Sequence, residues 1–200
     1  RQFRALRGPA GPTAADAEVA PGQAHRPARC VRTCARQGPP LKRILILGGT
    51  GFVGRAVCEA LARQQPELRL RVPTRRPAHG DTVRALPNVD LLTANVHEDA
   101  ALAQLVQGCD AVVNLIAILH GSASAFEQVH VALPRRLAAA CRAASVRRVV
   151  HVSALGVGPD APSQYLRSKT QGEAVLAAAG LELTLLRPSV IFGAHDRFLN

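Results

Sequence analysis

The sequence contains no methionine, no tryptophan and only one tyrosine, so aromatic residues make up 3% of its 200 residues. Its core must therefore be aliphatic, and a hydrophobic content of 48% is enough to form one. Proteins that bind nucleic acids use basic stripes and stacking aromatic side chains. Because aromatics are scarce and the arginines are dispersed, we expect no nucleic-acid partner, although the net charge is +11.

Long apolar runs and secretion signals are also missing. No uninterrupted apolar run is long enough to span a bilayer, which predicts no transmembrane segment. The start of the chain lacks the charged, apolar and small-residue regions of a signal peptide. The five cysteines form no metal-like pair of pairs, and the seven histidines are scattered. We expect no metal site, and we expect a reducing, cytoplasmic location, with peripheral attachment at the cytoplasmic face of the inner membrane as the alternative.

Residues 1–40 show neither helical nor strand periodicity and are rich in Ala, Arg, Pro and Gly. Seven arginines against Asp16 and Glu18 give this stretch +5 of the net charge. Such a composition cannot bury enough apolar surface to fold, so we predict disorder. We interpret the stretch as a non-native extension translated from upstream sequence, and we expect the domain itself to cover residues 41–200.

Four consecutive large apolar residues, Ile44 to Leu47, predict a strand that is buried on both faces. Glycines follow, and a helical pattern begins at Phe52. A strand, a glycine turn and a helix form the context that a dinucleotide fingerprint requires. An early glycine permits a tight turn, Gly51 allows close approach of a pyrophosphate, and Gly54 brings helix and strand together. We expect the pyrophosphate to lie on Gly48, Gly49, Thr50, Gly51, Phe52, Val53 and Gly54.

Strands and helices alternate along the rest of the chain. After the first helix, the pattern predicts strands at 69–74, 89–94, 111–117, 146–153 and 183–186. It predicts helices at 81–86, 99–106 and 123–144, and a last helix that is capped by Ser163 and runs to Gly180. This alternation indicates a parallel, doubly wound α/β Rossmann sheet with strand order 3-2-1-4-5-6.

The choice of cofactor depends on the residues about twenty positions after the glycines. An NAD site has an acidic residue there that binds the ribose hydroxyls. This chain has Arg75 and Arg76 instead, with no carboxylate nearby. A guanidinium pairs with a 2′-phosphate, which a carboxylate would repel. The sequence therefore favours NADP(H), with NAD(H) as the alternative.

Tyr165 is the only tyrosine, and Lys169 is one of two lysines. Four residues apart, they share one face of the predicted last helix. A neighbouring ammonium and a helix N-terminus both favour the phenolate, so we expect the pKa of Tyr165 to be lowered.

Together these segments resemble the short-chain dehydrogenase/reductase superfamily in its extended and atypical branches, which include NAD-dependent epimerase/dehydratase-like proteins. The resemblance covers residues 42–200. Segments 165–169, 187–193 and 196–200 look most similar to the NADPH-binding accessory subunit of respiratory complex I and its bacterial relatives. The remaining segments that carry the resemblance are 48–54, 114–117 and 151–154.

The resemblance implies roles for individual residues. Lys169 would bind the nicotinamide ribose, Tyr165 would be the acid/base, and Arg75 would hold the adenosine phosphate. The implied catalytic set is Ser153, Tyr165 and Lys169, and cofactor contacts extend to Arg75, Arg76, Asn95, Val96, Ala117 and Lys169. Asn95 stands where relatives usually have an Asp that contacts the adenine, and its amide can still form a hydrogen bond there.

The sequence departs from catalytic relatives at two positions. Leu155 stands where they place the Ser or Thr that polarises the substrate carbonyl, and His130 stands where they often have Asn. We therefore keep two hypotheses. The chain is an oxidoreductase or epimerase that acts on an unidentified small molecule by hydride transfer, or it is a non-catalytic NADPH-binding structural or assembly subunit of complex I. In this superfamily the substrate lobe lies largely C-terminal to residue 200, so we expect the sequence to be a fragment without that lobe.

Overall fold

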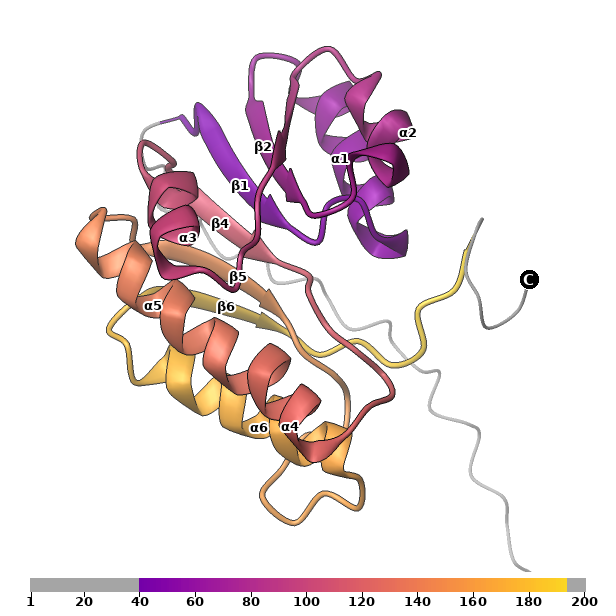
Figure 1. The fold of residues 1–200 in the computed structure, drawn as a ribbon, viewed down its shortest axis with the longest axis vertical. Helices are drawn as coiled ribbons and strands as arrows, with labels where there is room; N and C mark the ends of the chain where they lie inside the picture. Colours follow the sequence, from indigo (N-terminus) through magenta and orange to yellow (C-terminus); the bar gives the residue numbers. More distant parts are fainter. Residues whose placement is uncertain (1–39, 194–200) are drawn as a thin grey trace, which may run out of the picture. The chain divides into compact units, whose positions relative to one another are not determined.

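The computed structural model describes residues 40–193. The predictions made for residues 1–39 and 194–200, including the disordered extension, lie outside this range. The described residues form one parallel sheet with strand order β3-β2-β1-β4-β5-β6, which confirms the predicted topology (Figure 1). Its strands are β1 (Arg43–Leu47), β2 (Arg69–Thr74), β3 (Val89–Thr93), β4 (Ala111–Asn114), β5 (Arg148–Val152) and β6 (Glu182–Leu186).

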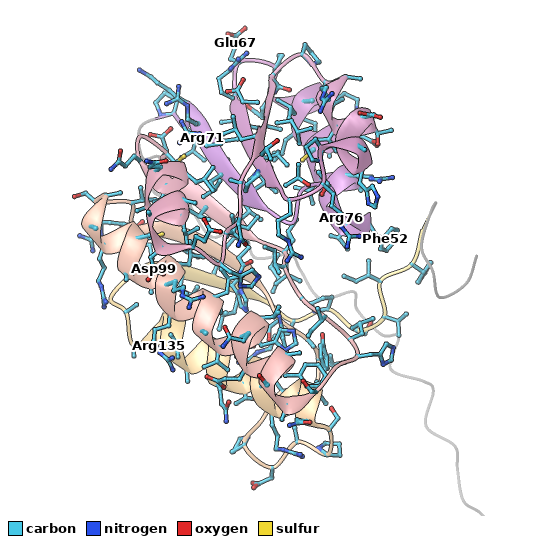
Figure 2. All side chains as sticks on the ribbon, in the orientation of Figure 1. Phe52, Glu67, Arg71, Arg76, Asp99 and Arg135 are labelled. Atoms are coloured by element: carbon cyan, nitrogen blue, oxygen red, sulfur yellow. The ribbon has the colours of Figure 1, made fainter. Side chains whose placement is uncertain are left out.

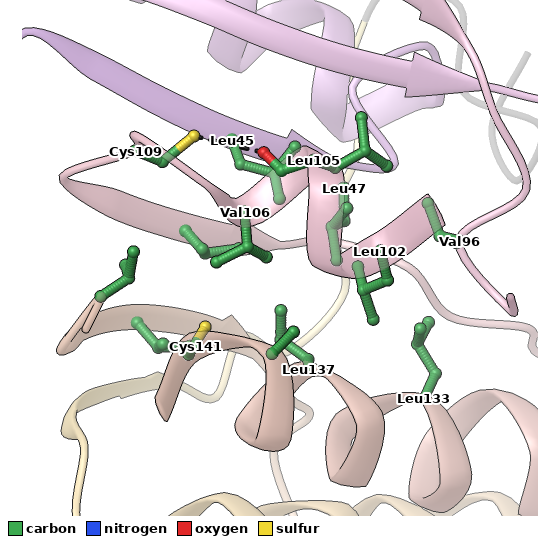
Figure 3. Close-up of a cluster of buried hydrophobic side chains, with 14 residues drawn as sticks. Leu45, Leu47, Val96, Leu102, Leu105, Val106, Cys109, Leu133, Leu137 and Cys141 are labelled. Atoms are coloured by element: carbon green, nitrogen blue, oxygen red, sulfur yellow. Dashed lines mark hydrogen bonds between the residues drawn. The ribbon is translucent and has the colours of Figure 1, made fainter. Parts of the chain in front are cut away.

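Helices cover both faces of the sheet. On one face, α1 (Phe52–Gln64), the 3₁₀ turn η1 (Pro77–Gly80) and α2 (Asp81–Arg84) enclose a cluster that includes Ile46, Cys58 and Val72. On the other face lie α3 (Asp99–Val106), α5 (Leu133–Ala143) and α6 (Gln164–Ala177). Figure 3 shows the larger core between the sheet and helices α3 and α5, with Leu45 and Leu47 facing Leu137. These buried side chains are aliphatic or small, as the scarcity of aromatics predicts.

Most element boundaries agree with the sequence patterns. The Oγ of Ser163 accepts a hydrogen bond from the N–H of Leu166 at 3.1 Å, which confirms the predicted cap of α6. Strand β4 ends at Asn114, three residues earlier than predicted, because the side chain of Asn114 accepts the N–H of Ile116 at 3.2 Å and turns the chain. The predicted helix over 123–144 consists of α4 (Ala123–Phe126), the π-helical segment η2 (Glu127–Ala132) and α5.

Three cysteines in the described part of the chain, Cys58, Cys109 and Cys141, are free and buried. Burial raises the pKa of Cys58 to about 11 and that of Cys141 to about 12, so these thiols stay protonated and unreactive. Within residues 40–193, no helix combines the length and the hydrophobicity needed to cross a bilayer. The same residues bring together no group of three or more metal-ligating side chains.

Candidate dinucleotide site

The glycine turn lies at the carboxyl end of β1. Gly48 has a φ of +82°, which side chains rarely adopt, and its carbonyl accepts the N–H of Gly51 at 3.0 Å. A Cβ at Gly54 would overlap the carbonyl oxygen of Gly48 and would lie 2.6 Å from the Cα of Gly49. Helix α1 therefore begins directly against the turn, as the fingerprint predicts.

The N-terminus of α1 is open to a ligand. Its N-cap residue, Gly51, is exposed and extended, no side chain caps the helix, and the first turn holds no acidic residue. The uncapped N–H groups and the positive end of the helix dipole attract an anion. The turn and the helix start therefore fit a pyrophosphate.

Arg55, which the sequence analysis did not single out, joins the two sides of this region. Its Nε donates to the carbonyl of Thr50 at 3.1 Å, and its Nη2 donates to the carbonyl of His79 at 3.2 Å. The glycine turn is thus tied to the segment that follows β2. The sequence feature that could have identified Arg55 is its position directly after Gly54.

Arg75 and Arg76 follow β2 and are both exposed. Figure 2 labels Arg76. The N–H of Arg76 donates to Oγ1 of Thr74 at 3.1 Å, which shapes the turn. Arg75 and Asn95 line a cavity of about 720 Å³ that extends along β3 and α3. The structure therefore brings the predicted phosphate-binding arginine and the predicted adenine-contacting amide to one opening.

Polar groups within the segment after β3 form hydrogen bonds with one another. Oδ1 of Asn95 accepts the N–H of His97 at 3.2 Å, and its Nδ2 donates to Glu98 at 2.9 Å. The side chain of Val96 is buried in the core beneath α3. The side chain of Val96 is thus unavailable to a nucleotide, and the cofactor contacts of Val96 and Asn95 stay predictions.

The loop after β4 packs against the glycine turn. A Cβ at Gly48 would lie 3.2 Å from Cγ1 of Ile116, and the next residue, Ala117, is exposed. Asn114 also bonds to Nδ1 of His151 at 3.1 Å, which joins β4 to β5. Ala117 therefore lies in the loop that borders the turn, as its predicted role requires.

Lys169 places a positive charge at the carboxyl end of β5. Its side chain is 1% exposed, and its Nζ donates to the carbonyl of Val152 at 2.7 Å. Desolvation lowers the pKa of Lys169 to about 8, although the nearby Glu173 acts in the opposite direction. At neutral pH the residue is a buried ammonium beside the strand ends where dinucleotides bind.

Tyr165 differs from expectation. Its partly buried ring lies edge-on to His130, with centroids 5.4 Å apart, and edge-on to Phe126 at 6.3 Å. Burial raises the pKa of its phenol, so the predicted lowering by Lys169 is wrong. The reason is desolvation by this packing, while the lysine ammonium bonds to the carbonyl of Val152.

Ser153 and Leu155 follow β5. Ser153 is 5% exposed, and its hydroxyl lies near the carboxylate of Glu173, whose pKa it helps to lower. Leu155 is 64% exposed, and its N–H donates to the carbonyl of Pro188 at 2.8 Å. Of these two residues at the carboxyl edge of the sheet, Leu155 is the exposed one and has no hydroxyl. Ser153 has a hydroxyl but is buried.

The segment after β6 crosses the carboxyl edge of the sheet. Arg187 binds Glu173 of α6 through two hydrogen bonds, of 3.0 and 2.5 Å. Burial raises the pKa of Glu173, but Arg187 outweighs this effect and keeps the pKa below its usual value. A Cβ at Gly193 would lie 3.8 Å from the Phe52 ring, so the segment reaches the start of α1 (Figure 1).

Comparison with known proteins agrees with this geometry. Residues 48–194 match a family described as NAD(P)H-binding. The chain is 34% identical over 158 residues to "NADH dehydrogenase [ubiquinone] 1 alpha subcomplex subunit 9, mitochondrial" of Mus musculus, covering 78% of this chain and 42% of that protein. It is 32% identical over 154 residues to the ceramide reductase of Caulobacter vibrioides, covering 76% and 47%.

The fold is shared with solved structures. The UDP-glucuronic acid 4-epimerase of Bacillus cereus, solved in complex with NAD, superposes with a TM-score of 0.68 at 18% identity. That match covers 76% of this chain and 58% of the epimerase. The chain spans less than half the length of the two curated relatives above. With the fingerprint, the sheet order and the family match all in agreement, the chain belongs to the NAD(P)H-binding family of epimerase-like short-chain dehydrogenase/reductase proteins.

Proposed function

We propose that this chain is the NADP(H)-binding domain of an oxidoreductase or epimerase that acts by hydride transfer. The observation that carries the proposal is Lys169, an ammonium that is 1% exposed at the carboxyl edge of the sheet, one helical turn from the only tyrosine. Burying a charge is costly unless it is paired and hydrogen-bonded. The ammonium has three donors and gives one hydrogen bond to the carbonyl of Val152, and a ribose hydroxyl at this edge would accept another. The similarity to a ceramide reductase supports a reductase in particular.

The residues of the chain would share the work. The glycine turn and the α1 N-terminus would bind the pyrophosphate, and Lys169 would orient the nicotinamide ribose. Tyr165 lies on α6, one helical turn before Lys169. It would give a proton to the substrate oxygen or take one from it. The bound cofactor would supply or accept the hydride.

We propose NADP(H) rather than NAD(H) as the cofactor because Arg75 is exposed at the opening it shares with Asn95. Hydrogen bonds to charged groups contribute about 1.5–3 kcal/mol. Arg75→Ala should therefore weaken NADPH binding about ten- to a hundredfold and leave NADH binding nearly unchanged. Calorimetric titration with both nucleotides measures this difference. Arg76→Ala is the matched comparison, and equal losses for the two nucleotides with Arg75→Ala would contradict the assignment.

A second candidate function has its own support. Burial raises the pKa of Tyr165, Ser153 is buried, and Leu155 replaces the expected hydroxyl. The relatives include a subunit of the NADH dehydrogenase [ubiquinone] 1 alpha subcomplex. In this alternative the chain binds NADPH without turnover, and its outer surface contacts a respiratory-complex partner.

Tyr165→Phe separates the two functions, because it keeps the ring but removes the transferable proton. If the chain is an enzyme, we expect turnover of a carbonyl or sugar-nucleotide substrate to fall about 10²–10⁴-fold, with NADPH affinity unchanged. The assay follows nucleotide oxidation by wild type and variant across a substrate panel. Tight NADPH that no substrate oxidises, with a variant indistinguishable from wild type, would support the subunit function instead.

We also propose a cytoplasmic location, with peripheral attachment at the inner membrane as the alternative. The three buried free thiols of the described domain are compatible with a reducing compartment. Fractionation of cells that express the tagged protein, with a salt wash of the membranes, would distinguish the two locations.

A further inference from the structure

We infer that His130 is a positioning residue, which holds the loop after β4 against helix α6 so that both present their nicotinamide-binding groups together. The inference rests on the proposed NADP(H) function, and it assigns a role to a buried histidine that the cofactor fingerprint does not include. His130 lies in the π-helical segment η2 and is 2% exposed.

Hydrogen bonds run through both ring nitrogens of His130. Its Nε2 accepts the N–H of Ile118, in the loop after β4, at 3.1 Å. An acceptor nitrogen carries no proton, so in the neutral ring the proton is on Nδ1. Nδ1 lies 2.8 Å from Oγ of Ser168 and donates to it. The hydroxyl of Ser168 in turn donates to the carbonyl of Tyr165 at 2.7 Å.

This chain of bonds links the two parts of the site that are far apart in the sequence. Ile118 follows Ala117, whose loop packs on the glycine turn, and Tyr165 begins the turn of α6 that ends at Lys169. The ring of His130 also packs against the rings of Tyr165 and Phe126. One side chain therefore fixes the loop, the tyrosine backbone and the tyrosine ring.

Two features of the fold bring His130 close to helix α6. The π-helical segment Glu127–Ala132 widens the helix at this point. On the facing helix, a Cβ at Gly172 would overlap the carbonyl oxygen of His130. Helix α6 can approach η2 only because residue 172 is glycine, and this contact sets the distance between Ser168 and the histidine ring.

The neutral form of the ring is stable over the physiological range. Burial and the nearby ammonium of Lys169 together lower the pKa of His130 to about 4. The ring therefore stays neutral, and Nε2 stays an acceptor for the loop.

The test compares NADPH with 2′,5′-ADP, which carries the adenosine and phosphate groups but no nicotinamide. Calorimetric titration uses the full 200-residue chain and the variants His130→Leu, His130→Gln and His151→Leu. We expect His130→Leu to weaken NADPH binding about tenfold and to leave 2′,5′-ADP binding within about twofold of wild type. His130→Gln, whose amide oxygen can accept the N–H of Ile118, should recover most of the affinity.

His151→Leu is the matched control, because His151 is also 2% exposed but bonds to Asn114. It should change the affinities for the two ligands by the same factor. Equal weakening of both ligands by His130→Leu would overturn the inference, as would unchanged NADPH affinity. If the wild type binds NADPH no more tightly than 2′,5′-ADP, the proposed roles of Lys169 and His130 at the nicotinamide end are both overturned. Wild-type protein that binds neither ligand would instead overturn the proposed function.

A second measurement does not depend on how the variants fold. The ¹⁵N chemical shifts of the imidazole ring in the wild type report which nitrogen carries the proton. We expect a protonated Nδ1 and an unprotonated Nε2 at neutral pH. A proton on Nε2 would remove the bond to Ile118 and overturn the inference.

Discussion

Lys169 should make the protein less stable than it would be without the charge, while improving its affinity for nucleotide. The ammonium is 1% exposed and is held by the carbonyl of Val152. We consider the replacement Lys169→Met, which keeps the length and apolar body of the side chain and removes the charge. Binding sites often carry such strained or destabilising groups because function requires them.

The magnitude follows from the pKa of Lys169. Each pKa unit corresponds to about 1.4 kcal/mol, so a fall from 10.5 to about 8 corresponds to roughly 3 kcal/mol of lost stability. The methionine variant avoids this loss but gives up the charged hydrogen bond to Val152, worth about 1.5–3 kcal/mol. At about pH 7 we therefore expect Lys169→Met to raise the free energy of unfolding by about 1 kcal/mol.

The pH dependence has a definite sign. Between about pH 8 and 10.5 the unfolded chain binds more protons at Lys169 than the folded chain. The free energy of unfolding of the wild type must therefore rise with pH in this window, while below pH 8 the contribution is constant. The advantage of the methionine variant should thus disappear as the pH approaches 10.5.

Nucleotide affinity should change in the opposite direction. Raising the pH from about 7 to 9 removes most of the ammonium, so NADPH affinity should fall by up to about tenfold. Urea unfolding of the wild type and the variant at three pH values, with NADPH titrations at each, measures both effects. The reasoning is refuted if the wild type and the variant show the same pH dependence of stability between pH 8 and 10, or if the variant binds NADPH as tightly as the wild type.

Two further predictions concern the glycine turn and the buried histidines. Gly54→Ala should lower the free energy of unfolding by about 1–3 kcal/mol and abolish NADPH binding, because the new Cβ would overlap the glycine turn. Gly158→Ala is the control: a Cβ at Gly158 meets open space, so this variant should change neither stability nor NADPH binding. Burial lowers the pKa of His130 to about 4 and that of His151 to about 3, so the unfolded chain binds more protons below pH 6.5. Acid should therefore reduce the free energy of unfolding by about 1.4 kcal/mol per pH unit for each histidine down to those values, and replacing both with glutamine should flatten the curve measured by urea unfolding.

The fold could be predicted from the sequence because its signals are local. The apolar run from Ile44 to Leu47 and the glycines after it specify a strand that is buried on both faces and then a helix start. Alternation of strands and helices then restricts the topology to parallel, right-handed crossovers. Even the N-cap of α6 at Ser163 follows from side-chain chemistry within four residues.

The features that could not be predicted from the sequence depend on contacts between residues far apart in the chain. The short β4 depends on the side chain of Asn114, and the close contact of α6 with His130 depends on the missing side chain of Gly172. The sequence predicts a lowered pKa of Tyr165 from two nearby features, the ammonium of Lys169 four residues away and the N-terminus of the same helix. In the fold, the rings of Phe126 and His130 bury the phenol, and desolvation acts against the charge that the sequence placed nearby.

The same desolvation affects the direction of the proposed reaction. Burial raises the pKa of Tyr165 and lowers that of Lys169 to about 8. At neutral pH the phenol therefore holds its proton, which suits an acid that protonates a developing alkoxide and disfavours a base that accepts a proton from an alcohol. An enzyme built on this site would thus reduce a carbonyl more readily than it would oxidise an alcohol. That direction consumes NADPH, the cofactor that we propose Arg75 selects, so the electrostatics of Tyr165 and the proposed cofactor preference point to the same reaction direction.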